Sequence, residues 1–112
     1  MKKIEAIVRV EKFGDVKEAL KKAGYPGLTT TPVEGHGKQK GLKQQFRGTI
    51  YEVEFIPKTK LEIVAQDGDV KKIVDAIVAN ARTGEVGDGK IFIYPVESVI
   101  RVRTGERDGD AL

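Results

Sequence analysis

"DVKKIVDAIVANARTGEVGDGKIFIY", residues 69–94, contains an amphipathic helix, a glycine-rich loop and a strand, in that order. Apolar side chains recur at intervals of three and four residues, which predicts a helix over 69–82 with one buried face. The run IFIY at 91–94 is typical of a strand. A helix that returns to a strand is half of a β-α-β unit. The helical stripe consists of Val70, Ile73, Val74, Ile77, Val78 and Ala81.

The loop TGEVGDGK nearly matches the phosphate-binding motif G-x-x-x-x-G-K, but Ile91 stands where a Ser or Thr should complete it. That motif also runs from a strand into a helix, whereas this loop runs from a helix into a strand. The pattern therefore excludes a P-loop nucleoside triphosphatase. The backbone N–H groups of Gly87 and Gly89, with Lys90, could still hold phosphate. The simpler alternative is that Gly84 caps the helix and the other glycines form a tight turn.

The N-terminal part of the chain predicts a strand, a helix and a second strand. Residues 2–10 (KKIEAIVRV) alternate between apolar and polar side chains, as a half-buried strand does. Helical spacing follows over 15–23, where Asp15 and Glu18 resemble a capping box at the helix start. The segment 28–34 (LTTTPVE) is rich in β-branched residues and predicts the second strand.

The remaining strands have distinctive faces. Pro32 places the second strand at a sheet edge or at a bulge. A strand over 57–66 has one apolar face and one mixed face. A last strand over 98–103 (SVIRVR) would point Arg101 and Arg103 the same way and present paired cations to an anion. Such a pair is more often a solvated face.

This element order predicts an α+β fold of one domain over 1–112, a ferredoxin-like double βαβ sandwich with an antiparallel sheet. Both helices would cover one sheet face. The other face has too many charged groups for a core and too many apolar ones for plain solvent exposure, so we expect a subunit interface there. It would carry Ile7, Arg9, Lys58, Glu62 and Val64.

The amino-acid composition excludes several classes of functional site. The chain has no cysteine and one histidine, His36, so disulfides, thiolate metal sites and multi-histidine metal sites are excluded. A net charge of +3 and the absence of Trp argue against a nucleic-acid surface. Apolar runs are too short to span a bilayer, and the N-terminus does not resemble a secretory signal. We expect a cytoplasmic protein.

A long loop over roughly 34–55 shows no convincing periodicity. It carries lysines and Arg47, together with the aromatic residues Phe46 and Tyr51. A loop of this kind suits insertion into a partner protein. The alternative is a solvated disordered segment.

Several segments together resemble the PII family of nitrogen-signalling proteins, of the GlnB and GlnK type. They are MKKIEAIVR, GLTTTPVEGHGKQKG, FRGTIYEVEFIPKTKLEIV, TGEVGDGKIF and IRVRTGE, which cover nearly the whole chain. The resemblance implies a homotrimer, a T-loop at about 37–55, a B-loop at about 82–90 and a C-terminal loop at about 102–112. It also implies a regulator, not an enzyme.

The resemblance implies that ATP or ADP binds between subunits, on the B-loop of one subunit, with the two arginines reaching the phosphates from its neighbour. The implied nucleotide-binding residues are Ile7, Thr29, Gly35, Gly37, Lys38, Gln39, Glu62, Val64, Gly87, Asp88, Gly89, Lys90, Arg101 and Arg103. Lys38 departs from the family's common arginine and cannot make a bidentate fork to phosphate. His36 replaces a common phenylalanine.

The same resemblance implies 2-oxoglutarate as an effector, bound beside Mg²⁺ and ATP. Gln39 would hold the metal, and Lys58 would pair with a carboxylate of the effector. The implied effector-binding residues are Gln39, Lys40, Gly41, Lys58 and Gly87.

The T-loop would dock on a target protein. Arg47 matches the residue that some members insert into an ammonium transporter, and Tyr51 matches a tyrosine modified by a uridylyltransferase. Glutamine synthetase, nitrogenase or another nitrogen enzyme remains open as the target, so contact with a membrane would come only through a protein partner. A nucleotide-hydrolysing enzyme lacks an evident general base, and an RNA-binding module of the same topology lacks paired aromatics on its central strands.

Overall fold

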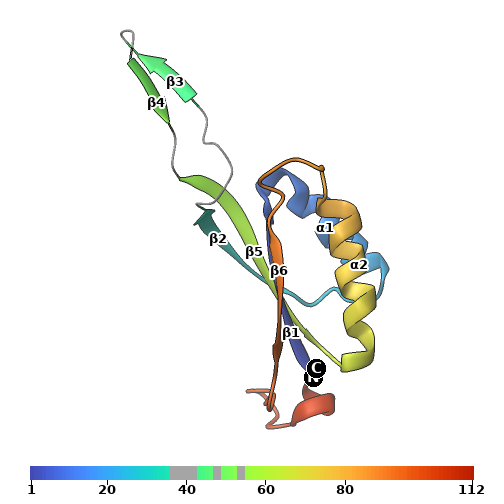
Figure 1. The fold of residues 1–112 in the computed structure, drawn as a ribbon. Helices are drawn as coiled ribbons and strands as arrows, with labels where there is room; N and C mark the ends of the chain where they lie inside the picture. Colours follow the sequence, from blue (N-terminus) through green and yellow to red (C-terminus); the bar gives the residue numbers. More distant parts are fainter. Residues whose placement is uncertain (36–42, 47–48, 53–54) are drawn as a thin grey trace.

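A computed structural model describes residues 1–35, 43–46, 49–52 and 55–112, with residues 43–46 and 49–52 described as backbone only. Four strands form an antiparallel sheet in the order β2-β5-β1-β6, and two helices pack on one side of it (Figure 1). This strand order and the two crossover helices confirm the ferredoxin-like α+β fold. The elements are β1 (Lys2–Arg9), α1 (Val10–Lys22), β2 (Thr29–Gly35), β5 (Ile56–Ala65), α2 (Val70–Ala81) and β6 (Lys90–Pro95), with 3₁₀ turns at Asp67–Asp69 and Asp108–Ala111.

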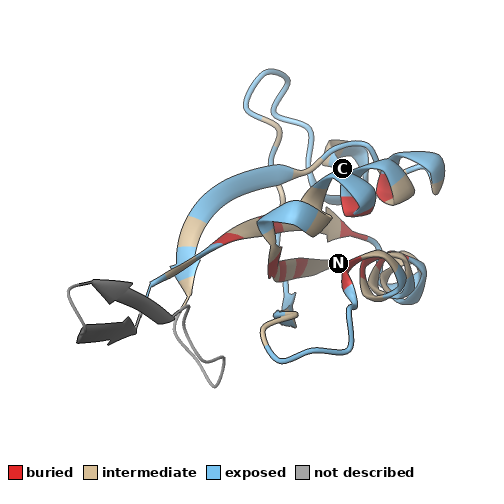
Figure 2. Cartoon of the chain, turned by 90° about the horizontal axis from the view of Figure 1, so that it is seen from above, coloured by how far each residue is buried: buried red, intermediate tan, exposed pale blue. Residues whose placement is uncertain are grey.

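The core lies between the helices and the sheet. Figure 2 shows the buried residues on the strands and on the helix surfaces that face them. Burying a large aliphatic side chain contributes about 1.5–3 kcal/mol, so this layer supplies most of the driving force for folding. Its fully buried large side chains are Ile4, Val16, Leu20, Leu61, Ile73 and Ile77. Pro32 lies in β2 at the sheet edge, as predicted.

The first helix begins earlier than the sequence predicted. α1 starts at Val10 directly after β1, so Asp15 and Glu18 lie inside it and do not cap it. Phe13, one turn before Val16, packs against the core and extends the apolar stripe toward the N-terminus. That burial outweighs the weak helix propensity of Gly14, which costs about 1 kcal/mol.

The long loop is not without secondary structure, which corrects the sequence-based expectation. Its backbone forms a two-stranded antiparallel sheet from β3 (Lys43–Phe46) and β4 (Thr49–Glu52). Phe46 pairs with Thr49, so only Arg47 and Gly48 separate the strands. A two-residue link containing glycine is a common hairpin signal, and its short flanking strands hid it from the periodicity analysis.

The predicted strand over 98–103 is wrong. The backbone there forms a single bridge, between Ile100 and Arg107, and a turn closed by the bond from the Gly105 N–H to the Arg101 carbonyl. Gly105 has φ 72, which permits the reversal. Val102 is fully exposed, so the alternating pattern of this segment does not mark a sheet face.

The sheet face away from the helices carries a polar network. Lys3 pairs with Glu62 at 3.5 Å, and Lys60 lies 3.9 Å from Glu5 and 3.6 Å from Glu62. The Tyr94 hydroxyl donates to Glu5 at 3.1 Å, and its ring lies 4.9 Å from the Lys3 ammonium. This face is mixed and half-buried, as the sequence predicted. No helix in the described part of the chain is long and apolar enough to cross a membrane.

Candidate functional site

The glycine loop between α2 and β6 has a backbone that only glycine adopts easily. Gly84, Gly87 and Gly89 have φ values of 90°, 104° and 102°. Non-glycine residues lose roughly 1–2 kcal/mol in such conformations. Three positive φ values within six residues turn the chain repeatedly, and a glycine-rich turn of this kind can form an anion-binding concavity of backbone N–H groups.

Gly89 is also a point of close approach. A Cβ atom at this position would lie 1.7 Å from the carbonyl oxygen of Ile7, well inside van der Waals contact. A Cβ on Gly84 would meet no atom within 4 Å. The loop is therefore pressed against β1 at Gly89 and open to solvent at its start.

Asp88 holds the loop from inside. Its carboxylate accepts the backbone N–H groups of Thr83 at 2.8 Å and Gly84 at 2.9 Å, and also the Thr83 hydroxyl. Arg9 donates to it from Nε at 3.0 Å. These bonds, the Thr83 hydroxyl first, hold the pKa of Asp88 well below its usual range. The Glu85 N–H donates to the Thr83 hydroxyl at 3.1 Å. Asp88 is thus an internal anchor, and the loop amides left for a ligand lie after Glu85.

Two cations fasten the loop tip to the sheet. Arg9 donates from Nη2 to the Val86 carbonyl at 2.9 Å, and Lys58 donates from Nζ to the Gly87 carbonyl at 2.5 Å. Burial lowers the pKa of Lys58, and the neighbouring Arg9 charge lowers it further. Arg9 and Lys58 are directly paired across β1 and β5, so both contacts come from the same end of the sheet.

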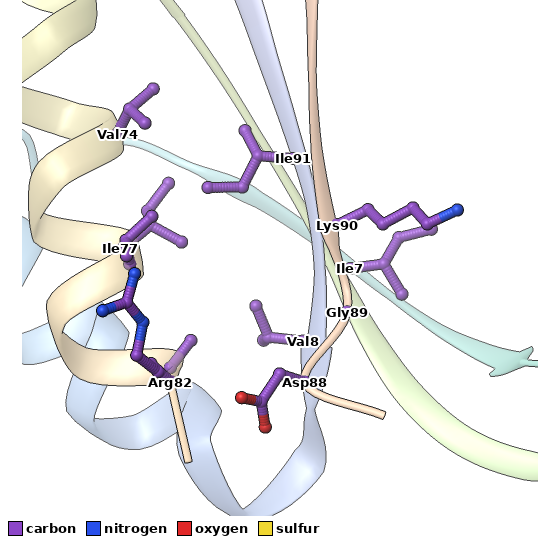
Figure 3. Close-up of a pocket in the computed structure, with 11 residues that line it drawn as sticks. Ile7, Val8, Val74, Ile77, Arg82, Asp88, Gly89, Lys90 and Ile91 are labelled. Atoms are coloured by element: carbon purple, nitrogen blue, oxygen red, sulfur yellow. The ribbon is translucent and has the colours of Figure 1, made fainter. Parts of the chain in front are cut away.

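The structure brings part of the predicted nucleotide set together. Ile7 and Lys90 are paired across β1 and β6, next to Gly89, and Figure 3 shows their side chains on the same side of the sheet. Gly35 lies beside Lys58, since a Cβ there would be 3.2 Å from the Lys58 Cγ. The exposed Lys90 ammonium has no ion-pair partner among the described residues. A free cation beside a glycine nest suits phosphate.

The rest of the predicted set lies elsewhere in the same chain. Thr29 pairs with Glu62, which is four positions along β5 from Lys58, or about 13 Å. Val64 lies two positions further. Arg101 and Arg103 follow the far end of β6, whereas the glycine loop precedes its near end (Figure 1). One chain therefore does not place its arginines beside its own loop.

A cavity of about 410 Å³ opens between α2 and the sheet (Figure 3). Its walls include Val8, Val74, Ile77 and Ile91, with Asp88 at one end. Ile7 and Lys90 border it through their backbone while their side chains point to the other side of the sheet. Arg82 and Asp88 bring one charge of each sign to the end of the cavity beside the C-terminus of α2. A mostly apolar cavity next to a helix C-terminus disfavours phosphate, so we place the candidate site on the opposite face, where the Lys90 side chain lies.

Comparison with known proteins identifies the family. The family model described as nitrogen regulatory protein P-II matches residues 1–106. The chain belongs to the P-II family. Proteins named nitrogen regulatory protein P-II are 54% identical in Synechocystis sp., 55% in Nostoc punctiforme and 51% in Azospirillum brasilense, each over 112 residues and the full length of both chains. Members of this family are signalling regulators rather than enzymes.

Some predicted P-II site residues lie outside the described part of the chain. These are Gly37, Lys38, Gln39, Lys40, Gly41 and Arg47, together with His36. Tyr51 lies in β4, where only the backbone is described. Among the described residues, no group of three His, Cys, Asp or Glu side chains could hold a metal ion.

Sequence reasoning about the P-II loop missed Arg9 and Thr83 as groups that shape it. The sequence pattern places Arg9 only on the mixed sheet face, and its bond to Asp88 spans 79 positions of the chain. A signal existed in the loop itself. Thr83 and Asp88 flank two of the three glycines with positive φ, and a carboxylate among expected phosphate ligands needs a local partner.

The P-II loop should resist acid to an unusual degree. Because folding lowers the pKa of Asp88, its contribution to stability is present above its unfolded pKa of about 3.9 and is lost only as the pH falls through the lower folded value. We expect the amide resonances of Thr83 and Gly84 to hold their positions through the pH range in which ordinary aspartates titrate. Nuclear magnetic resonance at decreasing pH tests this. A transition of both amides near pH 4 would contradict the internal anchor.

Proposed function

We propose that this chain is a nitrogen-signalling regulator that binds ATP or ADP on the B-loop, responds to 2-oxoglutarate and acts on target proteins through its T-loop. The observation that carries the proposal is the preformed loop: Gly89 packs against the Ile7 carbonyl, and the Lys90 ammonium beside it has no ion-pair partner in the part of the chain that the structure describes. A preorganised anion site binds with little ordering cost. The phosphates would lie on the later loop amides and Lys90, and Gln39 would hold Mg²⁺.

We infer a homotrimer whose nucleotide sites lie between subunits. Arg101 and Arg103 lie far from the loop of their own chain. This separation supports the arrangement, because the arginines of a neighbouring chain could reach that loop. The separation of Thr29, Glu62 and Val64 from Lys58 along β5 supports it too. The sheet face away from the helices also carries exposed Phe92 and Tyr94. Their aromatic rings are apolar surface that a subunit interface would cover. The trimer would be cytoplasmic and would reach membranes only through a protein partner.

Effector binding should depend on nucleotide. Lys58 lies at the B-loop, where its ammonium donates to the Gly87 carbonyl, and a carboxylate bound there would share or compete for that ammonium. If Mg²⁺ takes the 2-oxo-acid end, 2-oxoglutarate should bind with Mg-ATP present and show no detectable binding without it. Because this coupling is reciprocal, 2-oxoglutarate should also tighten ATP binding by the same factor. Calorimetric titrations in both orders measure both effects. Equal effector affinity with and without Mg-ATP would refute the proposal.

The T-loop is the proposed output, and an ammonium transporter is its proposed target. Arg47 offers five donors on a long side chain, which suits a narrow polar opening. We expect ADP to favour the complex and 2-oxoglutarate with Mg-ATP to dissolve it. Glutamine synthetase or another nitrogen enzyme is the second candidate. Tyr51 is the proposed position for uridylylation, which would alter the same loop.

Membranes carrying the transporter provide the test. Arg47→Ala should weaken binding at least about tenfold, the loss expected for a charge-assisted contact, whereas Lys43→Ala removes a neighbouring cation and should have a smaller effect. If neither the Arg47 substitution nor the choice of ligands changes binding, the transporter is not the target.

A further inference from the structure

Asp88 presents an electrostatic problem in a loop that would hold phosphates. An ionised carboxylate repels a polyphosphate, and the repulsion grows with the number of charged phosphate groups. The low pKa of Asp88 means that it stays ionised at neutral pH. The loop must therefore both orient this carboxylate and compensate its charge.

Orientation is provided within the loop. The carboxylate accepts the N–H groups of Thr83 and Gly84 and the Thr83 hydroxyl. Figure 3 shows it on the α2 side of the sheet, opposite the side chains of Ile7 and Lys90. These neutral donors direct the carboxylate away from the proposed ligand but do not cancel its charge.

Compensation comes from Arg9. Its Nε lies 3.0 Å from Asp88 Oδ1, its Nη2 donates to the Val86 carbonyl at 2.9 Å, and its side chain is only 16% exposed. The carboxylate of Glu11 lies 3.9 Å from Nη1 but is largely exposed, so it competes weakly. Lys58 and Arg82 are the other cations nearby: the Lys58 ammonium donates to the Gly87 carbonyl, and Arg82 lines the same cavity as Asp88. Among the described residues, Arg9 is the cation that hydrogen-bonds to Asp88.

We propose that Arg9 is a positioning residue of the nucleotide site: it neutralises Asp88 and fixes the Val86 carbonyl, so that the loop accepts a polyphosphate. This inference rests on the proposed function. Arg9 acts through two loop residues and does not have to touch the nucleotide. Its charge should matter more for ATP than for ADP, and least for AMP, because the repulsion that it cancels increases with each phosphate. A purely structural role would weaken all three nucleotides alike.

The test compares nucleotide affinities by calorimetry in Mg²⁺-free buffer. Arg9→Gln should lower ATP affinity about tenfold and ADP affinity about threefold, so the ATP:ADP affinity ratio falls. Arg9→Lys keeps the charge and should keep the wild-type ratio. Adding Asp88→Asn to Arg9→Gln removes the uncompensated charge and should restore the ratio. Lys17→Gln removes one positive charge from an exposed position on α1 and serves as the charge control.

Equal losses for ATP, ADP and AMP in Arg9→Gln, or a ratio that Asp88→Asn does not restore, would overturn the inference. Thermal unfolding confirms that each variant is folded. If Arg9→Gln does not fold, Asp88→Asn alone decides. It leaves the Arg9 charge uncompensated, so the ATP:ADP ratio should rise above the wild-type value even though overall affinity falls, and an unchanged ratio would refute the proposal. A wild-type chain that does not bind ATP would instead refute the proposed function.

Discussion

Alanine at position 89 should lower ATP affinity by at least about 100-fold, or about 2.7 kcal/mol. The added Cβ would lie 1.7 Å from the Ile7 carbonyl oxygen, so either the loop or β1 has to move by more than an ångström. Its φ of 102° adds roughly 1–2 kcal/mol of backbone strain. Calorimetry with ATP measures the affinity, and chemical unfolding measures the accompanying loss of stability.

Gly84→Ala is the matched control for this substitution. Gly84 has a similar φ, 90°, but a Cβ there meets no atom within 4 Å. Gly84→Ala should introduce the backbone strain of a positive φ without any steric clash, so its effect on ATP affinity should be much smaller than that of Gly89→Ala. Equal losses for the two variants would mean that the approach of the loop to Ile7 does not govern binding.

Removing Arg103 should lower ATP affinity about 10- to 150-fold, which corresponds to about 1.5–3 kcal/mol for a hydrogen bond to a charged group. Arg101 should cost less, because its guanidinium already donates to Glu106 at 2.9 Å and has to exchange one partner for another. Arg107→Ala is the control, since it removes an exposed arginine from the same segment. Calorimetry that finds Arg103→Ala indistinguishable from Arg107→Ala would exclude Arg103 from the site.

The parts of the fold that the sequence predicted well are those where burial repeats along an element. Ile73 and Ile77 reveal α2 in the sequence because the helix is stabilised mainly by burying the stripe to which they belong. The strand prediction over 98–103 was wrong because burial does not repeat along that segment. Its alternating side chains look like a strand, but Ile100 makes only a bridge and Val102 is fully exposed, so no sheet uses the alternation.

The candidate site was predictable only in part. Gly89 and Lys90 were recognisable because the types and spacing of residues within one short segment indicate a phosphate-binding loop. The anchoring role of Arg9 was not, because it depends on β1 and the loop meeting across 79 positions, and no pattern within either segment encodes that contact. The inward orientation of Asp88 likewise depends on the geometry that the glycines permit.

The central claim is that each nucleotide site combines the loop of one chain with the arginines of another. We expect Lys90→Ala and Arg103→Ala chains each to bind ATP poorly on their own. The two variants are unfolded together, refolded as mixed trimers and titrated with ATP. Sedimentation should give about three times the 12.3 kDa chain mass. If sites form between chains, an intact loop meets an intact arginine in about a quarter of all sites, which should regain wild-type affinity. If both groups act within one chain, the mixture should bind no better than its separate components, and that result would contradict the account.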